Sequence, residues 1–313
     1  MSDDYLWDRS GPADPEIAKL EQLLAPLAYT EVRKPRRKRY WIGAAVVAAA
    51  AAVLVIFAWP RASACDGDGF RFTGVGGDVA CGSRQLAAGV LPVGATLDTQ
   101  GNTAELAIAE IGTAQLGTHT RVRLERTGAE RHQLYLEQGT MHARVKAPPR
   151  LFSVSTPSSE VTDLGCEYAI AVDPTGAGTI RVLGGKVELD EQGGIVVAPA
   201  GTHAAIHPGR RPGYPIATGA SEAFEAAVAD YERGVAGALD RLLAAATASD
   251  AITLINLAVI EPGRVDVLRR LGEISSVPDG VTVDKAVADA SARSLWREAV
   301  VNTQVHVSDW LQQ

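Results

Sequence analysis

Aromatic residues are scarce in this chain of 313 residues, where they make up 5%, while alanine is abundant. This composition favours close packing of small side chains and helical segments. The hydrophobic content of 46% and the charged content of 21% are typical of a globular protein, which excludes wholesale disorder. The length corresponds to roughly two domains.

Signature motifs of enzymes are also missing. The chain has no GxSxG, no HExxH, no GxxxxGK[ST] and no CxxC or His/Cys metal spacing. The Asp66-Gly67-Asp68-Gly69 run lacks the rest of a calcium loop. We expect five histidines to lie on solvated strand faces, because no acidic partner stands near them at ligand spacing: His119, His132, His142, His203 and His207. The sequence predicts no enzyme, no cofactor and no metal site.

Positive charge is not in excess, since the net charge is −7. Nucleic-acid binding depends on clustered positive charge, so the composition argues against a nucleic-acid partner. The charges are unevenly distributed: residues 1–32 carry seven acids and two bases, whereas residues 33–39 carry six bases and no acid.

No charged residue occurs between Tyr40 and Trp59. Twenty helical residues span about 30 Å, the hydrocarbon thickness of a bilayer. Tyr40, Trp41 and Trp59 stand at the ends of the run, where interfacial aromatics are found, and Pro60 ends it. The sequence therefore predicts one transmembrane helix over residues 40–60. The alternatives are a buried core helix and a cleaved signal peptide, for which the preceding 39 residues are too long and too acidic.

The basic cluster before this segment sets its orientation by the positive-inside rule. We expect the N-terminus to lie in the cytoplasm and the bulk of the chain to lie in the periplasm. The predicted location is the inner (cytoplasmic) membrane, crossed in a single pass.

The cytoplasmic head, residues 1–39, contains one predicted helix, with Asp14 as its cap and Pro15 in its first position. An apolar stripe follows at helical spacing, made of Ile17, Leu20, Leu24 and Leu27. Because 39 residues cannot bury a core alone, we expect the stripe, with Trp7, to dock in the groove of a partner. A solvated tail with an interfacial helix is the alternative.

Two cysteines lie just beyond the predicted membrane segment, on its periplasmic side, where the environment is oxidising. Cys65 and Cys81 are sixteen positions apart, and either a disulfide or two free thiols is compatible with that spacing. The third cysteine, Cys166, alternates with Tyr168, Ile170 and Val172, so we expect these four to share a buried face. Glu167 is then expected on the solvent face.

From Asp66 to about Pro215 the hydrophobic pattern has period two, with turns every 8–12 residues. The apolar positions include Ala104, Leu106, Ile108, Val122, Leu124, Met141, Ala143, Val145, Val187 and Leu189. The pattern predicts an all-β roll, solenoid or sandwich. We assign residues 61–93 to a juxtamembrane strand region and residues 94–215 to the main β-domain.

The period becomes helical from Ser221, so residues 216–313 are predicted to form three or four helices. One apolar stripe includes Phe224, Val228, Tyr231, Val235, Leu239 and Leu242. Asp250 and Asp284 are candidate N-caps, and Pro262 and Pro278 are candidate breaks between helices.

The run from Gly94 to Gly201 resembles a FecR domain, the periplasmic module of FecR-type transmembrane regulators. The resemblance is carried by Gly94-x-x-Leu97-x-Thr99, Leu136-x-x-Gly139, Phe152-x-Val154-x-Thr156-Pro157, Val161-x-x-Leu164-Gly165-x-x-Tyr168-x-Ile170-x-Val172 and Val182-x-x-Gly185-x-Val187-x-Leu189. Several features depart from the family pattern. Residues 165–168 read Gly-Cys-Glu-Tyr where Gly-Thr-x-Phe is usual, and the cytoplasmic head is shorter than an anti-sigma domain and lacks the His-x3-Cys-x2-Cys motif of zinc anti-sigma factors. After the β-domain the chain continues into helices, where many iron-uptake regulators have a small α/β subdomain.

The resemblance implies transmembrane signal transduction. A periplasmic β-domain would sense a signal, and residues 1–39 would control a sigma factor of the extracytoplasmic type. The signal could be an envelope protein or a glycan. The alternative is a membrane-anchored envelope binding or scaffold module without sigma-factor control.

Overall fold

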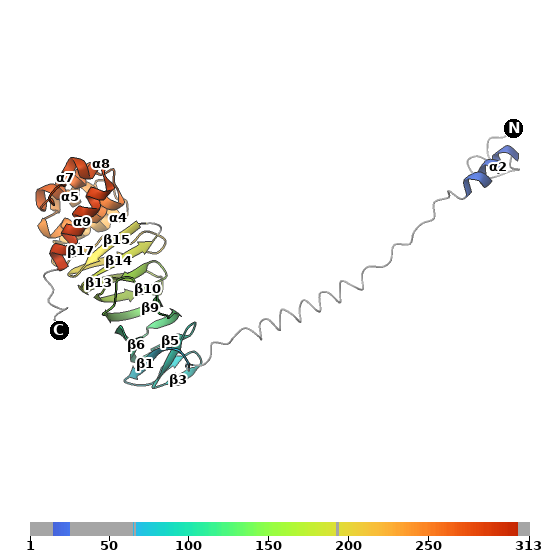
Figure 1. Ribbon diagram of the computed structural model, residues 1–313, viewed down its shortest axis with the longest axis horizontal. Helices are drawn as coiled ribbons and strands as arrows, with labels where there is room; N and C mark the ends of the chain where they lie inside the picture. The colour runs from blue at the N-terminus through green and yellow to red at the C-terminus, as the bar shows by residue number, and fades with distance from the viewer. Residues whose placement is uncertain (1–14, 26–64, 66, 192–193, 306–313) are drawn as a thin grey trace. The chain divides into compact units, whose positions relative to one another are not determined.

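The computed structural model describes residues 15–25, 65, 67–191 and 194–305. The chain divides into two units, residues 1–60 and 61–313. Helix α2 (Pro15–Leu24) belongs to the first unit (Figure 1). No helix within the described ranges is long and apolar enough to cross a bilayer. The span predicted over residues 40–60, with its flanking aromatics, lies outside those ranges.

The second unit begins with a domain of short strands, as the period-two pattern predicts. In chain order the strands are β1 (Gly69–Val75), β2 (Val79–Cys81), β3 (Arg84–Leu86), β4 (Ala88–Pro92), β5 (Thr96–Asp98), β6 (Thr103–Ile108), β7 (Gly112–Leu116), β8 (Arg121–Arg126), β9 (His132–Val145), β10 (Phe152–Ser155), β11 (Glu160–Asp163), β12 (Glu167–Val172), β13 (Gly178–Gly184), β14 (Lys186–Glu191), β15 (Gly194–Pro199), β16 (Thr202–Ile206) and β17 (Ile216–Ala217). The prediction of an all-β domain is confirmed.

The strands form two sheets that share β9. In the first sheet the order is β4-β1-β6-β7-β9-β12-β13-β16-β17, with every pair antiparallel. In the second sheet the order is β3-β2-β5-β8-β9-β10-β11-β14-β15, and only β9 and β10 are parallel. Strands β1 and β4, from the segment before Gly94, are therefore integral to the first sheet.

Strand β9 changes sheets at Gly139. Residues before it pair with β8 and β10, and residues after it pair with β7 and β12. Gly139 has a φ of +100°, and a Cβ atom there would collide with the backbone of Thr120. Glycine at this crossing therefore allows the residue just before β8 to pack closely against β9.

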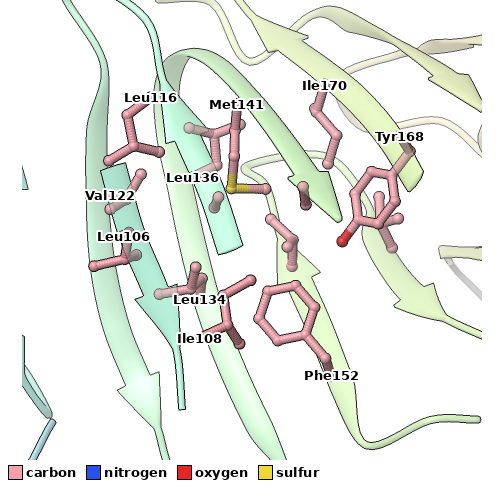
Figure 2. Packing of buried hydrophobic residues seen from close by; sticks show 14 of the residues in the cluster. Leu106, Ile108, Leu116, Val122, Leu134, Leu136, Met141, Phe152, Tyr168 and Ile170 are labelled. Carbon is pink, nitrogen blue, oxygen red and sulfur yellow. The ribbon is translucent and has the colours of Figure 1, made fainter. Parts of the chain in front are cut away.

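The core of the β-domain lies between the two sheets. Alternate side chains of both sheets point inward and are buried, including Leu106, Leu116, Met141 and Ile170 from the first sheet and Leu134 and Phe152 from the second (Figure 2). Cys166, Tyr168, Ile170 and Val172 are all buried. The alternation predicted from the sequence is confirmed.

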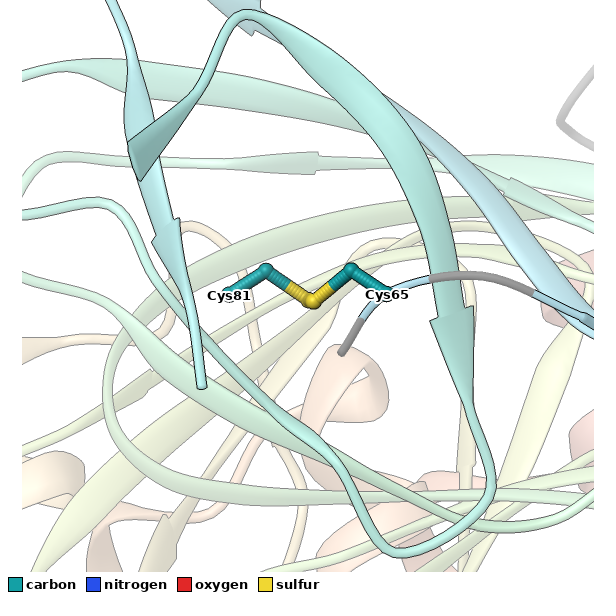
Figure 3. The surroundings of a disulfide bond; sticks show 2 residues. All are labelled: Cys65 and Cys81. Carbon is teal, nitrogen blue, oxygen red and sulfur yellow. A yellow bond between two sulfur atoms is a disulfide. The ribbon is translucent and has the colours of Figure 1, made fainter. Parts of the chain in front are cut away.

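A disulfide joins Cys65 to Cys81 at the end of β2 (Figure 3). Both cysteines are buried, and the carbonyl of Cys65 accepts a hydrogen bond from the N–H of Val90 in β4. The bridge therefore fixes the point at which the chain enters the domain.

The C-terminal region contains six described α-helices, not the three or four predicted. They are α4 (Glu222–Glu232), α5 (Ala238–Ala245), α6 (Ala251–Ile260), α7 (Val265–Ile274), α8 (Val283–Ala288) and α9 (Ala290–Val305), with a 3-10 turn, η2 (Ala248–Asp250), before α6. The single stripe predicted from Phe224 to Leu242 is wrong, because Gly234 and Gly237 take left-handed backbone angles that separate α4 from α5. Val235 between them is exposed.

Two predicted helix caps also differ. Thr282, not Asp284, caps α8, and its hydroxyl accepts a hydrogen bond from the N–H of Lys285. Asp250 precedes α6 but makes no cap hydrogen bond to it, because its carboxylate accepts from the N–H and hydroxyl of Thr247.

Helix α6 holds the helical region against the β-domain. Eight of its ten residues are buried, and Asn256 within it bonds to Val197 of β15. The hydroxyl of Thr253 donates to the carbonyl of Pro215 at 2.6 Å. The helices therefore cover the outer edge of the last strand in the second sheet.

Candidate functional site

Helix α2 is the part of the predicted partner-binding site that the structure describes. None of its residues is buried. Leu20 and Leu24 are 58% and 56% exposed, and Ile17 is half-buried. Trp7 and Leu27 lie outside the described ranges. The helix thus presents two of the predicted leucines to its surroundings.

Leu23 is a further apolar residue on α2 that the predicted stripe omitted. It is 75% exposed, more than either leucine of the stripe. At 100° per residue, Leu23 lies about 60° from Leu20, so it widens the stripe on one side. A helical wheel includes Leu23 when the apolar face is taken as an arc and not as a single row of residues.

A trough of about 750 Å³ lies on the outer face of the first sheet and crosses β6, β7, β9, β12 and β13. One row of register partners crosses the trough. In order across the sheet the row is Thr73, Glu105, Gln115, His142, Ala169, Arg181 and His203, and its members from Glu105 to Arg181 line the trough. This volume falls within the range of ligand sites.

The floor of the trough is made of small residues. Ala169 and Ala171 of β12 lie between the longer side chains of β9 and β13, and Gly117 lies beside Thr140. A Cβ atom on Gly117 would collide with the hydroxyl of Thr140. The hollow therefore exists because small side chains occupy alternate positions on adjacent strands.

Glu167 and His142 differ from their predicted environments. Glu167 is only 9% exposed, although its position faces outward, because Arg144 covers it with two hydrogen bonds of 3.0 and 3.1 Å. His142 Nε2 lies 2.9 Å from the same carboxylate. Burial would raise the pKa of Glu167, but the Arg144 and His142 contacts outweigh it and lower that pKa.

Two more histidines are not simply solvated. His132 is buried, its Nδ1 lies 2.9 Å from the Thr127 hydroxyl, and burial lowers its pKa. His207 Nε2 lies 3.0 Å from a carboxylate oxygen of Glu232. The expectation that these histidines lack acidic partners is wrong for His142 and His207, because their partners are distant in sequence.

Asp163 and Cys166 form a buried pair beneath the sheet face. The Cys166 thiol donates to Asp163 Oδ2 at 2.6 Å, and the Gly165 N–H donates to Oδ1 at 2.7 Å. Burial raises the pKa of Asp163 to about 6 and raises the pKa of the Cys166 thiol far above its usual value. Cys166 is therefore a buried thiol whose environment disfavours the reactive thiolate form.

The described residues contain no cluster of three or more His, Cys, Asp or Glu side chains arranged to hold a metal ion. Two surface features stand out among these residues. One is the exposed apolar arc of α2, and the other is the trough on the first sheet.

The solved structures that resemble this chain include two crystal structures of a candidate anti-sigma factor from Parabacteroides distasonis ATCC 8503. The first, at 1.65 Å resolution, is 17% identical, with a TM-score of 0.32 over 36% of this chain and 54% of that one. The second, at 2.50 Å, is 16% identical, with a TM-score of 0.26 over 45% of this chain and 57% of that one. The chain thus spans little more than half the length of either.

No curated protein matches the sequence. Residues 95–188 match the family described as FecR protein. These residues run from the start of β5 into β14 and carry most of the trough. The resemblance seen in the sequence is confirmed over residues 95–188, which are similar to the FecR protein family.

Proposed function

We propose that the chain regulates a sigma factor of the extracytoplasmic type and transmits a signal across the inner membrane. The cytoplasmic head, residues 1–39, binds the sigma factor. The uncharged run from Tyr40 to Trp59 spans the membrane once, and the FecR domain lies in the periplasm. The FecR match and the charge asymmetry around that run support this arrangement.

The observation that carries the proposal is the exposed apolar arc of α2. A ten-residue helix that buries none of its residues and exposes three leucines has no core of its own. Isolated helices of this length are marginal in water, so docking in a partner's groove would both order the helix and cover its leucines. A sigma factor is the partner implied by the FecR resemblance.

The test compares sigma-factor binding and transcription in cells that express the full chain or its variants. Each buried leucine contributes roughly 1.5–3 kcal/mol, so Leu20→Ala with Leu24→Ala should weaken binding at least ~100-fold. Genes that depend on the sigma factor should become constitutively expressed. Gln22→Ala, on the polar side of α2, is the matched control and should change neither reading.

An unchanged transcriptome, with the double variant present at its normal level, would contradict sigma-factor control. That result would favour the alternative function, an envelope binding or scaffold module that the N-terminal segment only anchors. Co-purification of the full chain with no sigma factor would point the same way.

A further inference from the structure

The trough on the first sheet ends in two opposite charges. Glu105 lies on β6 and Arg181 lies on β13, both exposed and both in the register row described above. Within the described residues neither side chain makes an ion pair or a hydrogen bond. Most of the other arginines on this domain that face outward are paired, including Arg121, Arg123, Arg144 and Arg150.

The separation of these two charges sets the size of a ligand. Glu105 and Arg181 are four strand spacings apart, through Gln115, His142 and Ala169. At 4.7–4.9 Å per spacing the two positions are about 19 Å apart. An extended peptide advances 3.3–3.6 Å per residue, so about six residues reach from one end to the other.

Along and beside the row from Glu105 to Arg181, the trough offers groups that suit a peptide backbone. Gln115 carries an amide, and Thr140 and Thr179 carry hydroxyls, each able both to donate and to accept a hydrogen bond. Across the described part of the chain, these three side-chain groups donate no hydrogen bond to another residue. The small floor residues Ala169 and Ala171 leave room for peptide side chains.

We propose that the trough binds an extended peptide segment of about six residues, with a cationic side chain over Glu105 and a carboxylate over Arg181. This inference deepens the proposed function, because it states what the FecR domain senses. The bound segment lies across the strands, on the face of the sheet, and adds no strand to an edge. A glycan is disfavoured because no Phe, Tyr or Trp lines the trough to stack against sugar rings.

The test uses the full chain and four pools of six-residue peptides with blocked ends and four randomised central positions. The pools carry Lys and Asp, two Lys, two Asp, or two Ser at their terminal positions. The Lys/Asp pool should bind at least tenfold more tightly than the Ser pool. Glu105→Arg should shift the preference to the Asp pool, and Arg181→Glu should shift it to the Lys pool.

The double variant Glu105→Arg with Arg181→Glu is the decisive protein. It should regain the Lys/Asp preference, because the peptide can lie in the opposite direction. This recovery also shows that the single variants lost specificity and not their fold. Glu110→Arg, an exposed charge reversal outside the trough, is the matched control and should bind like the wild type.

The inference is overturned if the Lys/Asp pool binds no better than the Ser pool, or if the single reversals leave the preference unchanged. If no peptide pool binds, and an uncharged oligosaccharide binds the wild type but not the Glu105→Arg or Arg181→Glu variant, the trough belongs to glycans and the inference is overturned as well. Sigma-factor binding by the same variants separates the two hypotheses. If it persists while peptide binding fails, only the peptide inference falls.

Discussion

Asn256 of α6 and Val197 of β15 are joined as two strands of a sheet would be joined. The Val197 N–H donates to Asn256 Oδ1 at 2.9 Å, and Asn256 Nδ2 donates to the Val197 carbonyl at 3.0 Å. One buried amide therefore satisfies both backbone groups of a strand edge that would otherwise invite pairing with another chain.

Replacing Asn256 should show how much its two hydrogen bonds to Val197 contribute to stability. Asn256→Leu leaves a buried N–H and a buried carbonyl without partners, which costs about 2–5 kcal/mol. We expect the midpoint of chemical denaturation to fall and the protein to self-associate through the uncovered edge. Asn302→Leu makes the same change at an exposed position of α9 and should do neither. Equal stability of the two variants would show that the Asn256 bonds are dispensable.

The exposed arc of α2 predicts a role for a leucine outside the original stripe. Leu23→Ala should weaken sigma-factor binding by roughly tenfold or more, since burial of one leucine contributes at least 1.5 kcal/mol. Trp7→Ala should act in the same direction. The affinity of each variant for the sigma factor is compared with that of Gln22→Ala. If Leu23→Ala binds as tightly as the control, the interface is limited to the predicted stripe.

The two faces of β12 should respond differently to substitution. Ile170→Asp places a carboxylate in the core, costs several kcal/mol and should abolish folding of the β-domain. Glu167→Ala frees Arg144 and His142 and should cost about 1–3 kcal/mol, more than an ordinary surface change. Ala171→Ser, at an exposed position of the same strand, should be neutral. Thermal melts of the three variants make the comparison.

Asp163 makes stability depend on pH. Its pKa is raised to about 6 in the folded protein, against about 3.9 when unfolded. Its contribution to stability is therefore fully present below pH ~4 and is lost as the pH rises through 6, a loss of up to about 3 kcal/mol.

Asp163→Asn should remove this loss, since an amide carries no charge to bury and its oxygen can still accept from the Gly165 N–H. The variant should gain stability relative to the wild type as the pH rises from 4 to 7, measured by denaturation at each pH. Asp240→Asn, at an exposed position, provides the comparison and should show no such trend. A wild-type-to-variant difference that is constant with pH would contradict the buried titration.

Orientation in the membrane has its own test. A reporter that is active only outside the cytoplasm should work when fused after Gln313 and should be silent at the N-terminus. Neutral replacement of the basic cluster should weaken this bias, the residues being Arg33, Lys34, Arg36, Arg37, Lys38 and Arg39. The reverse activity pattern would contradict the proposed topology.

Local patterns in the sequence predicted the elements of the β-domain well. Alternation is a property of one strand, so the buried positions of β6, β9 and β12 could be read directly. The trough could not be predicted, because Glu105 and Arg181 come to lie in one row only through the pairing of five strands.

The wrong expectations for His142 and for the helical stripe also arise because local patterns do not record distant contacts or backbone angles. Glu167, the carboxylate partner of His142, lies 25 residues away along the chain, so no local spacing reveals it. The helical stripe from Phe224 to Leu242 continued in the sequence across a glycine-containing turn, where left-handed backbone angles override apolar periodicity.

The disulfide near the start of the second unit also determines how the domain would bear a mechanical load. Tension applied at Cys65 from the N-terminal side passes through the sulfur atoms to Cys81, and so reaches β2 without stretching the intervening segment. Strand β1, which pairs with both β4 and β6, would be shielded from being peeled off the first sheet. A chain tethered at that end could be pulled without distorting the first sheet, so reducing agents should lower the force at which the domain unfolds.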